Sequence, residues 1–215
     1  MAFGLTKRKA ALLLFHGAPV LLLHCWDYIS QQLTVADSEW SRDLDVFELF
    51  SGHGELGRQC RDAGFDVRTS DITKGKLHDI MTPEGFMLVL KGVLRLRYNG
   101  QLWLGVPCNS WVFMSSSTTK RTSSNHGIMG DEGVESVASG NIIAARVALL
   151  CMVAVIRNCY WCAEQPSSSC LKECPYISHV LTSVGPNFMK RTWMGAYGHW
   201  AAKPSQLWGS WWLGC

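Results

Sequence analysis

Charged residues are scarce in this sequence, and neither sign dominates. Lysine and arginine number 20 and aspartate and glutamate 17, so charged residues are 17% of the 215 and the formal net charge is +3. Such a balance permits a nucleic-acid partner but does not indicate one. Hydrophobic residues make up 47% of the chain, which supplies a sizeable core and argues against global disorder. The length predicts one domain with an extension.

Internal repeats are also absent, and the one low-complexity stretch is SSSTTKRTSSN at residues 115–125. The nine cysteines do not follow the spacing of a disulfide framework, and their number is odd. Both features favour a reducing compartment, nuclear or cytoplasmic. In such a compartment most of these thiols are expected to pack as small buried hydrophobes.

Residues 1–40 are expected to form an N-terminal extension that precedes a domain at 41–215. A basic patch at residues 7–9 comes before the apolar run AALLLFHGAPVLLLHC, which resembles a signal peptide. Histidine, glycine and proline interrupt this run, and it is too short to span a bilayer. A helix docked on the following domain is the alternative interpretation. No other stretch is predicted to cross a membrane, so no membrane partner is expected.

From residue 46 onward the pattern alternates between strands and helices. Strands are predicted at VFELF, FDVRTSD, QLWLGV, CYWCAEQP and FMKRTWMGAYG, and helices at GELGRQCRDAGF, TPEGFMLVLKGVLRL and SGNIIAARVALLCMVAVI. This alternation predicts an α/β fold with a mostly parallel sheet and helices on both faces. Ligands in such folds bind beyond the carboxyl ends of the strands. Three strand ends carry unusual residues there: FSGHGELG, VPCNSW and AEQP.

The first of these strand ends is a glycine loop. Gly52, Gly54 and Gly57 satisfy G-x-G-x-x-G between a predicted strand and a predicted helix, and Asp71 ends the next strand. The glycines allow a tight turn and close approach of a ligand, and the carboxylate can accept hydrogen bonds from ribose hydroxyls. A dinucleotide and S-adenosylmethionine both fit, so an NAD-linked oxidoreductase remains one hypothesis. Asp79 has two interpretations, a contact to adenine or a cap for the helix that begins near Thr82.

The other two strand ends carry a thiol and a carboxyl group. Cys108 follows Pro107 directly, and Glu164 precedes Gln165 and Pro166. Alone, Cys108 could be a packed core residue, but a thiol opposite a carboxyl group makes a nucleophile and acid pair. Cytosine needs such a pair. A thiolate added to carbon 6 makes carbon 5 nucleophilic enough to accept a methyl group, provided that an acid stabilises charge at ring nitrogen 3.

In this order, FELFSGHGELGRQCRDAGF, GVPCNSW and CAEQP resemble the cytosine-5 DNA methyltransferases over residues 45–209. The resemblance implies a Rossmann-like methyltransferase fold, S-adenosylmethionine as methyl donor, Cys108 as nucleophile and Glu164 as the residue that contacts the base. DNA is the implied substrate, and RNA is a variant of the same hypothesis. The positions that match the cofactor site of the family are Phe50, Ser51, Gly52, Gly54, Asp71, Ile72 and Asp79.

The sequence also departs from the family pattern. Val106 replaces the first of two prolines before the cysteine, and Glu-Gln-Pro replaces Glu-Asn-Val. The family's Gln-x-Arg-x-Arg motif has no match, and Arg121 and Arg191 are candidate substitutes. Too few residues follow Glu164 for a target-recognition domain, which a partner would then supply. The alternative function is a catalytically inactive remnant that binds S-adenosylmethionine or nucleic acid.

Two further patterns bear on ligands. Lys120 and Arg121 lie among hydroxyl residues directly after the predicted nucleophile, where a loop can hold phosphates around a flipped base. Cys159, Cys162, Cys170 and Cys174 have thiolate spacing that would suit zinc. However, residues three apart on a strand point to opposite faces, so no metal site is predicted.

Overall fold

The computed structural model describes residues 41–122, 124–183, 188–193 and 204–210. The chain divides into two compact units, Met1–Arg42 and Asp43–Cys215, and all the described strands and helices belong to the second unit. The N-terminal extension at 1–40, with its predicted docked helix or signal segment, lies outside the described residues.

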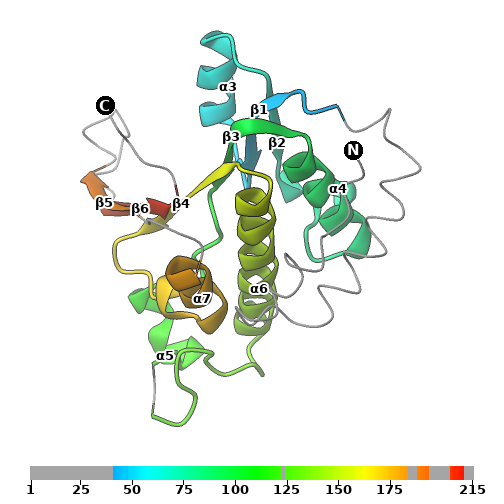
Figure 1. Ribbon diagram of the computed structural model, residues 1–215. Helices are drawn as coiled ribbons and strands as arrows, with labels where there is room; N and C mark the ends of the chain where they lie inside the picture. The colour runs from blue at the N-terminus through cyan, green and yellow to red at the C-terminus, as the bar shows by residue number, and fades with distance from the viewer. Residues whose placement is uncertain (1–40, 123, 184–187, 194–203, 211–215) are drawn as a thin grey trace, which may run out of the picture. The chain divides into compact units, whose positions relative to one another are not determined.

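Six strands form one sheet in the order β2-β1-β3-β4-β6-β5 (Figure 1). In chain order their bounds are β1 Leu44–Leu49, β2 Val67–Ser70, β3 Leu96–Leu104, β4 Tyr160–Pro166, β5 Phe188–Trp193 and β6 Pro204–Gly209. β1 pairs in parallel with β2 and β3, and β3 pairs in parallel with β4. The predicted α/β architecture is therefore confirmed.

The prediction of a mostly parallel sheet is wrong, because the sheet is mixed. β6 lies between β4 and β5 and runs antiparallel to both. Only residues 194–203 connect Trp193 to Pro204, and a parallel pairing needs a crossover of about a dozen residues or more. A connection of this length joins neighbouring strands antiparallel, so β6 reverses direction beside β5.

Helices cover both faces of the sheet, as predicted. The longer ones are α3 Glu55–Asp62, α4 Pro83–Leu94, α6 Glu135–Ile156 and α7 Pro175–Ser183, and α5 is a single turn at Ser116–Thr119. A Cβ on Gly57 of α3 would meet Glu48, whereas a Cβ on Gly92 of α4 would meet the Phe47 ring. Because Phe47 and Glu48 are consecutive in β1, they point to opposite faces. α3 and α4 therefore pack on opposite sides of the sheet.

α6 lies between α4 and α7 and contacts β4 (Figure 1). It is long and apolar enough to cross a membrane by length and composition. Its buried residues, among them Val147, Leu150 and Ala154, instead pack in the core of the domain.

Two tryptophans on the neighbouring strands β4 and β6 pack against each other. Trp161 and Trp208 are almost fully buried, and their rings pack edge to face with centroids 6.0 Å apart.

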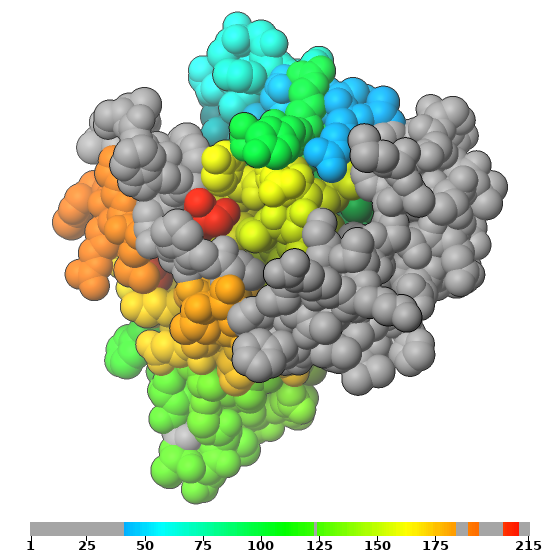
Figure 2. Space-filling model, viewed as in Figure 1, coloured from blue at the N-terminus to red at the C-terminus, as the bar shows by residue number. Residues whose placement is uncertain are grey.

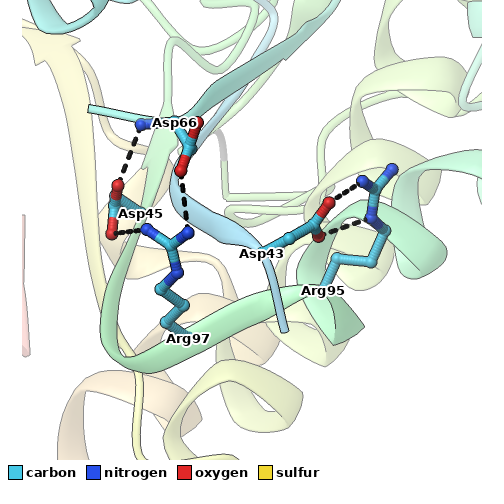
Figure 3. A network of polar contacts seen from close by, with 5 residues as sticks. All are labelled: Asp43, Asp45, Asp66, Arg95 and Arg97. Carbon is cyan, nitrogen blue, oxygen red and sulfur yellow. Dashed lines mark hydrogen bonds and ion pairs between the residues drawn. The ribbon is translucent and has the colours of Figure 1, made fainter. Parts of the chain in front are cut away.

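Ion pairs tie the amino ends of three strands together (Figure 3). Arg97 of β3 contacts Asp45 of β1 at 2.6 Å and Asp66, directly before β2, at 2.7 Å. Arg95 binds Asp43 in the same way, and this hydrogen bond lowers the pKa of the Asp43 carboxyl. These partly exposed pairs add little stability individually. They help to set the strand register at the edge opposite the glycine loop.

Candidate functional site

The glycine loop begins with a residue in an unusual backbone conformation. Phe50 follows β1 with φ 59°, and Gly52 and Gly54 have φ 50° and 70°. Left-handed backbone is rare for residues other than glycine and occurs preferentially at functional sites. The amide of Gly54 donates to the Ser51 carbonyl at 2.7 Å, which closes the turn before α3. The hydrogen bond gives the loop one defined shape. The left-handed φ values explain why glycine occupies positions 52 and 54.

Asp71 contacts this loop directly. Its Oδ2 accepts a hydrogen bond from the Gly52 amide at 2.8 Å, and its Oδ1 accepts from the Thr73 amide and hydroxyl. Partial burial opposes ionisation, but the hydrogen bonds from Thr73 and Gly52 and the charge of Lys74 outweigh it and lower the pKa of Asp71. Asp71 is therefore ionised near neutral pH and retains acceptor capacity for a further donor.

Ile72 and Asp79 lie beyond the end of β2. The Ile72 side chain is 62% exposed, so its apolar surface is available to a ligand. Asp79 is half-buried, and its Oδ1 accepts from the Met81 amide at 2.9 Å. The cap of α4 is Thr82, whose hydroxyl accepts from the Gly85 amide. Asp79 thus supports the turn before the helix, and Thr82 rather than Asp79 supplies the helix cap.

Glu48 is a polar residue of this region that sequence reasoning missed. It lies in β1 beneath α3, is 5% exposed, and accepts a hydrogen bond from the Gly57 amide at 2.9 Å. Burial raises the pKa of Glu48, against the lowering effects of that hydrogen bond and of Lys74 and Arg61. A charged residue inside the apolar run VFELF was the available signal.

Replacing Glu48 with glutamine is expected to change how stability depends on pH. The pKa of Glu48 is higher in the folded state than in the unfolded state. Ionisation of Glu48 therefore destabilises the folded protein, and this loss of stability grows as pH rises from the unfolded-state pKa through the folded-state pKa. Glutamine can still accept from the Gly57 amide and stays neutral. The free energy of unfolding of Glu48→Gln minus that of wild type should therefore increase with pH above about 4.5. Urea unfolding from about pH 4.5 to 8 tests this, and a difference that falls with pH would contradict it.

The loop that carries Cys108 is held against β1 and β4. Gly105 donates its amide to the Leu49 carbonyl at 3.0 Å, and a Cβ on Gly105 would lie 2.9 Å from the Phe50 carbonyl oxygen. On the other side, Nε2 of Gln165 donates to the Val106 carbonyl at 2.5 Å. Cys108 itself is half-buried, and its carbonyl accepts from the Trp111 amide at 2.8 Å. The Cys108 loop is therefore close to the glycine loop and to the end of β4.

Glu164 is half-buried in β4, one residue before Gln165. Register pairs join Glu48 to Trp103 and Trp103 to Cys162, so these three residues share one sheet face. Glu164, two residues after Cys162, projects from that same face. Gln165, the neighbour of Glu164, contacts Val106, which lies two residues before Cys108. The carboxyl group and the thiol thus belong to adjacent strand ends.

Gln165 is fully buried and organises this junction. Besides Val106, it binds Ser169, whose hydroxyl donates to the Gln165 Oε1 at 2.8 Å. The Ser169 Oγ in turn accepts from the Leu171 amide. In the sequence, Gln165 was notable only as a departure from the family pattern. The structure gives it a function in joining the loops that follow β3 and β4.

The two basic residues after Cys108 lie in different environments. Lys120 is exposed, in left-handed backbone after α5. The segment that contains it is part of the green surface at the bottom of the view in Figure 2. Arg121 is 3% exposed, and its donors are used within the protein. Arg191, the other candidate arginine, is exposed on β5.

The cysteines considered for zinc do not form a metal site in the part of the chain that the structure describes, where no group of three or more His, Cys, Asp or Glu residues is suitably placed. Cys159 and Cys162 lie in or beside β4, and Cys174 is buried directly before α7. Cys170 instead donates its thiol to the Trp111 carbonyl at 3.1 Å.

Comparison with known proteins adds no identification. No protein-family model, no curated protein and no solved structure matches this chain.

Proposed function

We propose that this domain transfers a methyl group to carbon 5 of cytosine in DNA through a covalent adduct with Cys108. The observation that carries the proposal is the Gln165–Val106 hydrogen bond, because it joins the Pro-Cys loop to the strand end bearing Glu164. The Pro-Cys loop also contacts the end of β1 directly before the glycine loop, through the hydrogen bond from the Gly105 amide to the Leu49 carbonyl. Because β1, β3 and β4 run parallel, the glycine loop, the Cys108 loop and the end of the strand that bears Glu164 lie at the same edge of the sheet.

The strand order supports a Rossmann-like methyltransferase fold. The chain passes from β1 to β2 on one side and then crosses to β3 on the other side of β1. Such a reversal creates a crevice at the carboxyl ends of the two central strands, where ligands bind in open α/β sheets. Doubly wound folds also tolerate antiparallel strands in an otherwise parallel sheet. The proposed site occupies this reversal point, since the glycine loop follows β1 and Cys108 follows β3.

The residues around the glycine loop fit S-adenosylmethionine. The Ser51 hydroxyl is buried and has no hydrogen-bond partner among the described residues, so a polar ligand could satisfy it. Gly52 and Gly54 have open space where a side chain would project. Asp71 supplies a carboxylate for ribose hydroxyls, and Ile72 supplies an exposed apolar surface for adenine. When bound, S-adenosylmethionine supplies an activated methyl group on a sulfonium.

The protein's own groups would act on the cytosine ring in sequence. The Cys108 thiolate adds to carbon 6, and the new carbon–sulfur bond moves an electron pair toward ring nitrogen 3. Glu164, as an acid, holds the proton that neutralises charge at that nitrogen. Carbon 5 becomes nucleophilic and would accept the methyl group, as the bond between that methyl group and the sulfonium breaks and its electron pair stays on sulfur, leaving a neutral thioether. A base then removes the proton from carbon 5, and the electron pair released expels the Cys108 thiolate.

Duplex DNA is the proposed substrate, and the target base must leave the stack to reach Cys108. Lys120 is exposed after the nucleophile loop and is the proposed phosphate contact. A partner that supplies sequence recognition is part of the same proposal. The reducing compartment indicated by the cysteines, nuclear or cytoplasmic, is compatible with this substrate.

Replacing Asp71 with asparagine should weaken S-adenosylmethionine binding. Asparagine removes the charged acceptor and places an amide donor among the Gly52 and Thr73 donors. Loss of hydrogen bonds to a charged group should raise Kd by roughly 10- to 100-fold. Isothermal titration calorimetry measures the change, with Asp62→Asn on the exposed side of α3 as the matched control. Equal affinities for wild type and Asp71→Asn would exclude Asp71 from the cofactor site.

The function itself is tested by transfer of a labelled methyl group from S-adenosylmethionine to DNA and RNA. Label in DNA alone supports the proposal, and label in RNA alone changes the substrate. S-adenosylmethionine binding without transfer by the folded chain would favour the inactive binding protein. Binding of NAD with no binding of S-adenosylmethionine would favour the oxidoreductase hypothesis.

A further inference from the structure

Arg121 is the centre of a buried hydrogen-bond cluster beside the Cys108 loop. Its Nε donates to the Ser110 carbonyl at 2.8 Å, and its Nη2 donates to the Ser110 hydroxyl at 3.0 Å. Its Nη1 donates to the carbonyls of Ile128 and Met129 at 2.8 and 3.1 Å. A longer contact of 3.4 Å joins Nη2 to the Val137 carbonyl in α6. All five guanidinium N–H groups therefore have an acceptor.

The same guanidinium stacks on the ring of Trp111, 3.4 Å from its centroid. Trp111 is 1% exposed, and its carbonyl accepts from the Cys170 amide at 2.9 Å. Packing around the cluster is tight, because a Cβ on Gly140 of α6 would lie 2.5 Å from the Ser110 hydroxyl oxygen. Arg121 thus contacts Ser110 and Trp111, the last two residues of the Cys108–Trp111 turn.

The guanidinium group of Arg121 is buried although it carries a positive charge. Arg121 has no carboxylate partner within ion-pair distance in the described part of the chain. Burial also lowers the pKa of its guanidinium. Burying a charged group without an ion-pair partner costs free energy unless all its hydrogen-bond donors find acceptors. The guanidinium group of arginine carries five donors in a rigid plane, so it can bind several carbonyl oxygens at once. Lysine, with three donors on a flexible stem, could not reproduce this arrangement.

We propose that Arg121 is a positioning residue for Cys108, holding the nucleophile loop by its far end while Gln165 holds it by its near end. Gln165 binds the carbonyl of Val106, two residues before Cys108. Arg121 binds both oxygen atoms of Ser110, two residues after it. The backbone that carries Cys108 is therefore held on both sides. This inference rests on the proposed function and replaces the predicted phosphate contact of Arg121 with a positioning role.

Two measurements on Arg121→Lys test the inference, with Arg68→Lys on an exposed strand position as the matched control. The first is steady-state methyl transfer, in which we expect kcat to fall by about 10- to 100-fold, the scale for misplaced reacting groups. KM for S-adenosylmethionine should stay within about twofold, because the glycine loop is untouched. The second is the rate of iodoacetamide alkylation of each cysteine, followed by mass spectrometry on the full chain.

The alkylation pattern separates positioning from general loosening. A freed loop should make Cys108 react several-fold faster, while the buried Cys151 and Cys162 stay as protected as in wild type. Faster reaction of all three thiols would overturn the inference, because Arg121 would then only stabilise the fold. Unchanged kcat with unchanged Cys108 alkylation would overturn it as well.

Two provisions keep the test decisive. If Arg121→Lys does not fold, Ser110→Ala serves in its place, because it removes one acceptor of the cluster. Ser110→Ala must then show a smaller fall in kcat together with a smaller rise in the rate of Cys108 alkylation. If wild type transfers no methyl group to any polymer, the proposed function fails. Cys108 alkylation then decides alone whether Arg121 restrains the loop.

Discussion

Replacing Cys108 with alanine is expected to abolish methyl transfer, with a loss in kcat on the order of 10⁴-fold or more, as for other enzymes that lose a nucleophile. Without the thiolate, no adduct forms at carbon 6, and carbon 5 stays too weakly nucleophilic to accept a methyl group. The assay is incorporation of labelled methyl groups into DNA at saturating S-adenosylmethionine. Binding of S-adenosylmethionine should persist, since Cys108 follows β3 whereas the glycine loop follows β1.

Cys60→Ala is the matched control, because Cys60 is also half-buried but lies on α3, away from the nucleophile loop. It should retain wild-type transfer. A Cys108→Ala protein that folds and still transfers methyl groups at the wild-type rate would exclude the covalent mechanism.

Replacing Glu164 with glutamine is expected to lower kcat by about 10²- to 10⁴-fold, the usual range for loss of a general acid. Glutamine has nearly the same shape and can donate a hydrogen bond to ring nitrogen 3. It cannot share a proton with that nitrogen as negative charge develops there. The loss should therefore appear in kcat, while binding of S-adenosylmethionine changes little.

The comparison for this variant is Glu173→Gln, an exposed position in the short turn after β4. Single-turnover rates of methyl transfer, measured with enzyme in excess over DNA, report the chemical step directly. Equal rates for Glu164→Gln and Glu173→Gln would remove Glu164 from the mechanism.

Part of the fold followed from the sequence because local patterns and tertiary contacts agree. The apolar run before the glycine loop forms β1, and the pattern from residue 139 lies within α6. The helix predicted at TPEGFMLVLKGVLRL extended too far, since α4 ends at Leu94 and β3 begins at Leu96. No local signal separates helix from strand in the apolar residues at that junction, and pairing with β1 decides it.

β6 and α7 were not predicted, for physical reasons that differ. β6 buries the polar residues Ser205 and Gln206 among apolar neighbours, so its sequence shows no alternation of apolar and polar residues. Gln206 is satisfied by carbonyls of Pro166 and Ser169, which only the tertiary structure brings near. α7 is nine residues long and depends on packing against α6.

The candidate site shows the same limit. Spacing alone led to Asp71, and the structure places its carboxylate on the Gly52 amide. Composition of the loop after Cys108 indicated that Lys120 and Arg121 would both face nucleic acid, yet only Lys120 is exposed. The burial of Arg121 depends on acceptors from α6 and from the chain before it. Long-range contacts of this kind leave no periodic pattern in a sequence.

The central claim, a covalent bond between Cys108 and cytosine, is tested most directly with DNA that carries 5-fluorocytosine. After methyl transfer to this ring, carbon 5 holds fluorine in place of the proton whose removal expels the thiolate, so the adduct cannot break down. With S-adenosylmethionine present, we predict a stable protein–DNA complex whose mass includes one methyl group, attached at Cys108 in the digested protein. A complex attached at another residue, or none from a chain that methylates ordinary DNA, would contradict the mechanism.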